Sequence, residues 1–115
     1  MRARTLTLAG LNAPLLALRL VSTEFGHLPA PDVSVSAIYP DRLELLFHDD
    51  LAGFEQWRCV LGIAQDAVVY RTQFGGRTLV LAAEGVFAGA VIVLTAFADQ
   101  PHAEDAATEW AGGAA

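Results

Sequence analysis

The segment "RLELLFHDDLAGFEQWRCVL", residues 42–61, decides the fold class, because its hydrophobic period changes partway along. In its first part, "RLELLFH", apolar residues recur at every second position, which is typical of a strand with one buried face. From Leu51 to Leu61 the apolar residues follow a helical period instead. Four of them lie within an arc of about 120° on the helical wheel: Leu51, Phe54, Trp57 and Leu61. The segment therefore predicts a strand followed closely by an amphipathic helix.

A second alternating stretch, "VSVSAIY" at residues 33–39, is joined to this strand through "PDR", residues 40–42. Because Pro-Asp is a strong turn pair, we predict an antiparallel hairpin with residues 40–42 as its loop. A two-residue loop would pair Ser34 with Phe47, whereas the three-residue loop places the large apolar residues of both strands on one face. The pairs predicted for it are Tyr39–Leu43, Ala37–Leu45 and Val35–Phe47.

A second hairpin is predicted after the helix. The stretches "AVVYRTQF" (residues 67–74) and "RTLVLAA" (residues 77–83) flank "GG" at residues 75–76. Two adjacent glycines can both take positive φ, which suits a two-residue hairpin turn. The predicted register pairs Tyr70 with Leu81 and Thr72 with Leu79.

The last predicted strand has apolar residues at both its odd-numbered and its even-numbered positions, and therefore on both faces. A turn predicted around Glu84 and Gly85 leads into "VFAGAVIVLTAFA", residues 86–98. A strand with apolar residues on both faces is covered on both sides or lines an interface.

The N-terminal part contains another helical pattern. Asn12 is a good N-cap, Pro14 suits a first helical turn, and apolar residues follow at helical spacing, so we predict a helix over residues 12–25. The segment "GHLPAPD", residues 26–32, ends this helix and forms an extended hinge. The resulting order is α, β, β, α, β, β, β. It predicts an α+β fold with an antiparallel five-stranded sheet and two helices packed against one face.

A chain of 115 residues has the common size of a single domain. We expect one domain over residues 1–98, whose body after the hinge spans residues 33–98. Residues 99–115 are expected to form an acidic flexible tail, in which Trp110 is the residue that could dock.

The composition predicts more apolar surface than one small core can use. Hydrophobic residues make up 54% of the chain and charged residues 17%. A partner subunit is the usual cover for such surplus, so we expect a homo-oligomer. Cys59 is the single cysteine, which excludes an internal disulfide and suits the reducing cytoplasm. The longest uncharged stretch, residues 5–18, is too short for a bilayer, which needs about 20 apolar residues, so we expect no membrane association.

The charge is unevenly distributed. Four of the 13 acidic residues lie at or after Asp99, where there is no arginine, so residues 1–98 carry nine acids against seven arginines. A nearly neutral body has no basic stripe for phosphate backbones. We therefore expect no nucleic-acid binding.

One cluster could bind a metal. His48, Asp49 and Asp50, together with His27 or His102, offer nitrogen and oxygen ligands for a divalent ion. The simpler interpretation is that Asp49 or Asp50 caps the helix beginning at Leu51, and that the other aspartate is favoured by the helix dipole. The sequence therefore predicts no metal and no cofactor, with the metal site as the alternative.

Other candidate binding residues lie on the predicted sheet and helix. Arg71, Gln73 and Thr78 would form a polar patch with Arg77 close by, which could hold an acidic segment such as the tail or could simply be solvated. Aromatic residues expected to face the core could line a pocket or fill the core. They are Tyr39, Trp57 and Tyr70. Cys59 has no histidine near it in sequence, so we interpret it as a small buried hydrophobe and not as a nucleophile.

The stretch "LPAPDVSVSAIYPDRLELLFHDDLAGFEQWRCVLGI", residues 28–63, together with the later arginine-bearing strand, glycine turn and apolar strand, resembles small proteins of actinomycetes. The resemblance covers about residues 28–98 and implies a single domain. It brings no activity and no site residues with it.

No phosphate-binding loop, zinc-protease motif, paired Cys-x-x-Cys or nucleophile elbow is present. The sequence therefore favours a non-catalytic protein-interaction or regulatory accessory protein, a homodimer with an unknown protein partner. The alternative is a small-molecule- or metal-binding module, or a small enzyme, with its site near His48, Asp49 and Asp50 or in a cavity between helix and sheet.

Overall fold

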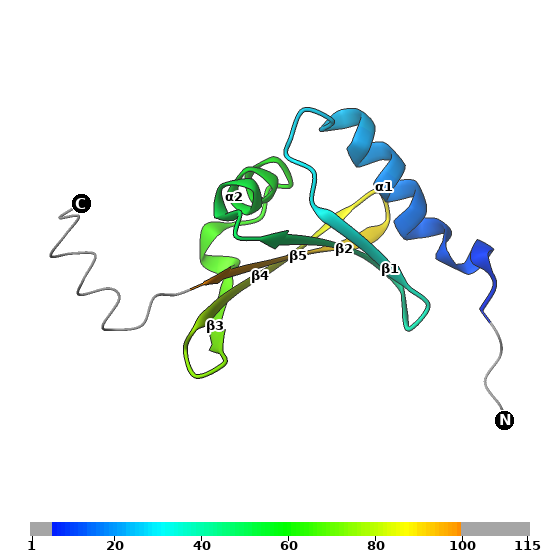
Figure 1. The fold of residues 1–115 in the computed structure, drawn as a ribbon. Helices are drawn as coiled ribbons and strands as arrows, with labels where there is room; N and C mark the ends of the chain where they lie inside the picture. The colour runs from blue at the N-terminus through cyan, green and yellow to red at the C-terminus, as the bar shows by residue number, and fades with distance from the viewer. Residues whose placement is uncertain (1–5, 100–115) are drawn as a thin grey trace, which may run out of the picture.

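The structure, a computed structural model, describes residues 6–99 and has two helices over a five-stranded sheet (Figure 1). The predicted α+β class is confirmed. The tail beyond Asp99, with Trp110 and His102, lies outside the described residues. The elements are the 3-10 helix η1 (Leu8–Leu11), α1 (Asn12–Glu24), β1 (Asp32–Ser36), β2 (Tyr39–His48), α2 (Leu51–Val60), the 3-10 helix η2 (Gln65–Ala67), β3 (Val69–Gln73), β4 (Thr78–Phe87) and β5 (Ala90–Asp99).

The sheet is mixed, so the prediction of a purely antiparallel sheet was wrong. Its spatial order is β1-β2-β5-β4-β3, and β2 and β5 pair in parallel, with Leu45 opposite Leu94. The other three pairings are antiparallel. The last strand thus takes the central position, where a strand that is apolar on both sides loses the most contact with water. Each hairpin had been predicted from local turn signals, which do not specify how two hairpins join.

The β1–β2 hairpin has a different register from the predicted one. Its turn holds two residues, since Ser36 pairs with Tyr39, and the Ile38 N–H donates to the Ser36 hydroxyl at 3.0 Å. The register shifts between Ser34 and Ser36, so that Val33 pairs with Leu45. Residues 40–42, predicted as the loop, lie inside β2 as part of this irregularity. The irregularity keeps the apolar positions of β2 on the helix side despite the shorter turn.

The β3–β4 hairpin confirms the predicted register, with Tyr70 opposite Leu81 and Thr72 opposite Leu79, but its turn spans the four residues 74–77 and not the predicted two. Gly75 and Gly76 both have positive φ, 66° and 86°. The next turn is not at Glu84 and Gly85, as predicted, but at residues 88–89, beyond the end of β4. Gly85 has a packing role instead, because a Cβ there would lie 3.0 Å from the Ile63 side chain.

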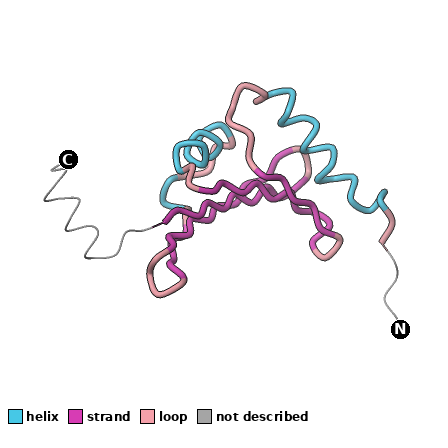
Figure 2. Tube along the Cα trace, viewed as in Figure 1, coloured by secondary structure: helices cyan, strands magenta, loops and turns pink. Residues whose placement is uncertain are grey.

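Both helices lie on the same face of the sheet (Figure 2). The core between the layers is formed by alternate residues of β2 and β5 together with Ala17, Val21, Phe54 and Trp57. The first helix begins at Asn12, so Asn12 is inside the helix and Leu11 occupies the cap position without a side-chain hydrogen bond. The predicted capping role of Asn12 was therefore wrong. None of the helices in residues 6–99 has the length and apolarity needed to cross a membrane.

Candidate functional site

The two aspartates before α2 have different hydrogen-bond partners within the chain. Asp50 is the N-cap of α2, and its Oδ1 accepts from the Gly53 N–H at 2.9 Å. Asp49 has a left-handed backbone with φ 55°. Its Oδ1 accepts from the Asp99 N–H at 3.2 Å, and its own N–H donates to the Phe97 carbonyl at 2.7 Å. One aspartate therefore starts the helix and the other ties the end of β2 to the end of β5.

His48 also does not complete a metal site. Its ring stacks on Phe97 with centroids 5.3 Å apart, and its Nε2 lies 3.4 Å from Oδ2 of Asp32. Both side chains of this pair are largely exposed. Within residues 6–99 no group of three histidine, cysteine or acidic side chains converges to hold an ion. The metal alternative of the sequence thus has no coordinating geometry in the described part.

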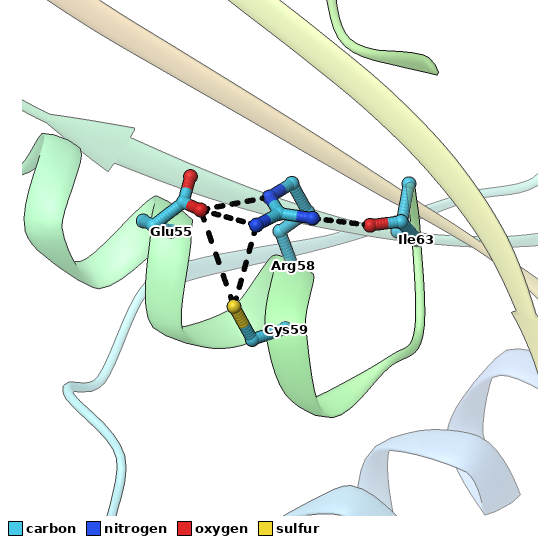
Figure 3. Close-up of polar contacts among 4 residues, drawn as sticks. All are labelled: Glu55, Arg58, Cys59 and Ile63. Atoms are coloured by element: carbon cyan, nitrogen blue, oxygen red, sulfur yellow. Dashed lines mark hydrogen bonds and ion pairs between the residues drawn. The ribbon is translucent and has the colours of Figure 1, made fainter. Parts of the chain in front are cut away.

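Cys59 lies in a small polar cluster on α2, shown in Figure 3. Arg58 donates through Nε and Nη2 to Oε2 of Glu55, and through Nη1 to the Ile63 carbonyl. Its Nη2 is also 3.3 Å from Sγ of Cys59. The hydrogen bond from Arg58 holds the pKa of the Glu55 carboxyl below its usual value, and the carboxylate raises the pKa of Arg58.

This arrangement explains the turn after α2 better than it explains any chemistry. The Arg58 side chain is only 11% exposed and bonds the carbonyl of Ile63, so it fixes the loop that follows the helix. The thiol of Cys59 is exposed, and the interpretation of it as a buried hydrophobe was wrong. The i,i+3 spacing of Glu55 and Arg58 on a helix is the sequence signal that indicates this cluster.

Of the three aromatic residues expected to face the core, only Trp57 does. It is 5% exposed, and its Nε1 donates to the Pro29 carbonyl at 2.9 Å. Tyr39 and Tyr70 are 51% and 59% exposed. Tyr39 lies at the start of β2, before the buried positions that begin at Leu43, and the Arg42 guanidinium stands over its ring at 4.7 Å. Tyr70 lies on the exposed edge strand β3 opposite the core residue Leu81, so the strand alternation gave its face of the sheet correctly but not whether a helix covers it there.

Trp57 borders an apolar pocket of about 250 Å³ between the end of α1, the 26–31 loop and the sheet. Its lining includes Leu18, Phe25, Leu28, Pro31, Leu45 and Trp57. The polar groups nearest to it are already bonded: Ser22 Oγ donates to the Arg19 carbonyl, and the Trp57 N–H is bound to Pro29. The sequence indicated this loop only as a hinge, although its prolines supply part of the lining.

The predicted polar patch is present on β3 and β4. Arg71 and Gln73 lie on one face of β3, with Arg71 Nη1 3.4 Å from Gln73 Oε1, and Thr78 is the register partner of Gln73. Arg77 lies in the adjoining turn. The structure therefore brings these four residues together at one corner of the sheet.

The larger feature is the sheet face opposite both helices, which we call the open face. Within residues 6–99 no helix covers it (Figure 1). Val86 and Val69 on this face are 75% and 61% exposed. Its apolar members are Leu46 on β2, Val69 on β3, Val80, Ala82 and Val86 on β4, and Val91, Val93 and Phe97 on β5.

Two carboxylates flank the middle of the open face. Val93 pairs with Glu44 on one side and with Glu84 on the other. The three side chains therefore share one row across the sheet, because directly opposite residues point to the same face. The open face is thus an apolar strip along β5 with an acidic residue on either side of its centre.

Comparison of the chain with protein-family models, curated proteins and solved structures finds no match.

Proposed function

We propose that this chain is a non-catalytic interaction protein, a regulatory accessory protein that forms a homodimer and binds another protein through its open face. The open face is the observation that supports this proposal. Val86 and Val69 are largely exposed on this face, and its other apolar members are half-buried except Val80, which is buried; exposed apolar patches commonly mark interaction sites. From strand rise and spacing, the face has an area of about 600 Å², close to one side of a standard protein interface.

The acidic flanks favour a partner other than a second copy on this face. A two-fold axis through Val93 would bring Glu44 and Glu84 of both copies together, and like charges at an interface are costly. A protein with an apolar ridge between basic side chains would match the same row. We therefore assign the open face to a different protein and look elsewhere for the contact between copies.

A second observation supports a role without acid–base chemistry. In the described part of the chain no polar or charged side chain is buried. Catalytic acids and bases are usually set in surroundings that shift their pKa strongly. We also propose a cytoplasmic location, because an exposed lone thiol such as Cys59 is suited to a reducing compartment.

The experiment has two parts. Light scattering after size-exclusion chromatography gives the oligomeric state, and we expect a dimer in the micromolar range. Proteins retained by the tagged chain are then purified and measured for direct binding to wild type, to the double variant Glu44→Gln with Glu84→Gln, and to Glu24→Gln on α1 as the matched control. The double variant should bind at least tenfold more weakly and with less salt dependence. A strict monomer that retains no protein, or a double variant that binds as tightly as Glu24→Gln, contradicts the proposal.

The apolar pocket beside Trp57 supports a second candidate, a module that binds a small apolar ligand. With its nearby polar groups already bonded, the 250 Å³ space suits a short alkyl chain or a single ring. Thermal shift with medium-chain alcohols and simple aromatics tests it. Stabilisation should disappear when Ala30→Trp fills the pocket, and an unchanged shift in that variant rejects the site.

A further inference from the structure

Within residues 6–99, the strand β3 is the edge of the sheet that no other segment protects. It ends the strand order, at the opposite end of the sheet from β1 (Figure 2). All its residues are exposed except Gln73, which is half-buried. Its backbone therefore offers unpaired donors and acceptors to another strand.

The other edge, β1, is protected in ways that β3 is not. Pro29 and Pro31 precede β1, and the register shift within the hairpin disturbs its regular ladder. Prolines and bulges are the usual means of blocking strand addition at an edge. The residues of β3, "VYRTQ", include no proline, and its register with β4 is regular. A new strand would therefore add at β3.

The register of β4 with its two neighbours fixes which residues of β3 present their backbone outward. Residues 88–89 form a two-residue turn, so the closing pair Phe87–Ala90 is hydrogen-bonded and the odd-numbered residues of β4 bond β5. The even-numbered residues of β4 therefore bond β3, where their register partners are Val69, Arg71 and Gln73. The N–H and C=O groups of Tyr70 and Thr72 then point to the free edge.

We propose that β3 pairs with β3 of a second copy, antiparallel, with Thr72 of each copy on the two-fold axis. In this register Arg71 of one copy is opposite Gln73 of the other, and the two Thr72 residues make the new backbone hydrogen bonds with each other. The inference rests on the homodimer of the proposed function and names the contact that forms it.

Side-chain pairing selects this register over its neighbour. With Thr72 on the axis, Thr72 faces Thr72, and the Arg71 guanidinium lies opposite the amide of Gln73, with which it already pairs inside one chain at 3.4 Å. A shift that puts Arg71 on the axis sets two like charges directly opposite, which destabilises a strand pair. The Thr72 register also brings Tyr70 of one copy near Phe74 in the turn of the other, and these residues are 59% and 72% exposed. Contact between two such aromatic side chains would cover apolar surface now open to water.

Disulfide cross-linking tests the register. The parent is Cys59→Ser, so that each variant has one thiol. Thr72→Cys should form a covalent dimer within minutes of mild oxidation, because Cα atoms of a hydrogen-bonded pair lie about 5.5 Å apart, within the range that a disulfide spans. Arg71→Cys should cross-link at least tenfold more slowly, since its mate would be a diagonal neighbour about 7–8 Å away. Val93→Cys, in the middle of the open face, should behave like Arg71→Cys.

A proline variant tests the edge without breaking the fold. The outward N–H of Thr72 is not needed by β4, and proline is tolerated on an edge strand whose N–H faces solvent. Thr72→Pro should weaken dimerisation at least tenfold in sedimentation analysis while circular dichroism stays like that of wild type. The matched control Thr72→Ala keeps the N–H and should dimerise far more tightly than Thr72→Pro.

The outcomes separate this inference from the proposed function. A wild-type dimer in which Val93→Cys cross-links faster than Thr72→Cys overturns the β3 contact and leaves the homodimer standing. Faster cross-linking of Arg71→Cys overturns the register. A wild-type chain that stays monomeric at all concentrations overturns both the contact and the homodimer.

Discussion

Replacing Asp50 by alanine is the sharpest test of how α2 begins. The variant removes the carboxylate that accepts from the Gly53 N–H at 2.9 Å. Gly53 is buried, so water replaces this acceptor poorly. Substituting an N-cap aspartate by alanine typically costs about 1 kcal/mol, and the lost interaction with the helix dipole acts in the same direction. For a domain of this size, about 1 kcal/mol lowers Tm by roughly 4–8 °C.

Urea unfolding followed by far-UV circular dichroism, with a thermal scan, measures this loss. Asp50→Asn is the matched control, because an asparagine side chain can also accept from the Gly53 N–H, and it should stay within about 0.5 kcal/mol of wild type. An Asp50→Ala variant as stable as wild type would refute the capping role. So would an Asp50→Asn variant that loses as much stability as the alanine variant, because the loss would then come from something other than the cap.

Two further predictions concern the neighbours of this cap. At Asp49, where φ is 55°, Asp49→Gly should be about 1 kcal/mol more stable than Asp49→Ala. Both variants lose the bond from the Asp99 N–H, but only alanine keeps the strained backbone. Equal urea midpoints for the two variants would contradict this. At Glu55, the lowered pKa means that the bond from Arg58 stabilises the fold when the pH is above the usual carboxyl value of about 4.5, and that this stabilisation is lost as the pH falls through the pKa of the folded state. The difference in unfolding free energy between wild type and Glu55→Gln should therefore disappear in acid. A difference that does not change with pH would exclude the Glu55–Arg58 pair as its cause.

The sequence predicted the features that depend on neighbouring residues. The positive φ required by a two-residue hairpin turn identified Gly75 and Gly76, and the register of β3 with β4 followed from them. The cap before α2 was narrowed to two aspartates, and the structure identifies Asp50. In each case the physical cause acts within a few residues, so the pattern is readable without the rest of the fold.

The sequence could not predict features that depend on which segments meet. The parallel contact of β2 with β5 joins residues about fifty positions apart, and no turn signal marks it. Tyr70 follows the correct strand alternation, yet it is exposed because the helices stop short of β3. The candidate site was missed for the same reason: Glu44, Val93 and Glu84 form one row only after β5 has entered between β2 and β4.

The placement of β5 also links the two proposed interactions. Both helices cover one face of the sheet, and in the described part of the chain no helix covers the other. An antiparallel contact between two β3 edges has its two-fold axis perpendicular to the sheet, which would put the open faces of both copies on the same side. The rows centred on Val93 would then repeat across a continuous ten-stranded surface. A partner with two basic segments could bind both copies at once, and its affinity would exceed that of either segment alone by the effective concentration of the second site. Dimerisation through β3 would thus strengthen binding at the open face without changing any residue on it, so Thr72→Pro should weaken binding of a two-segment partner far more than binding of a single segment.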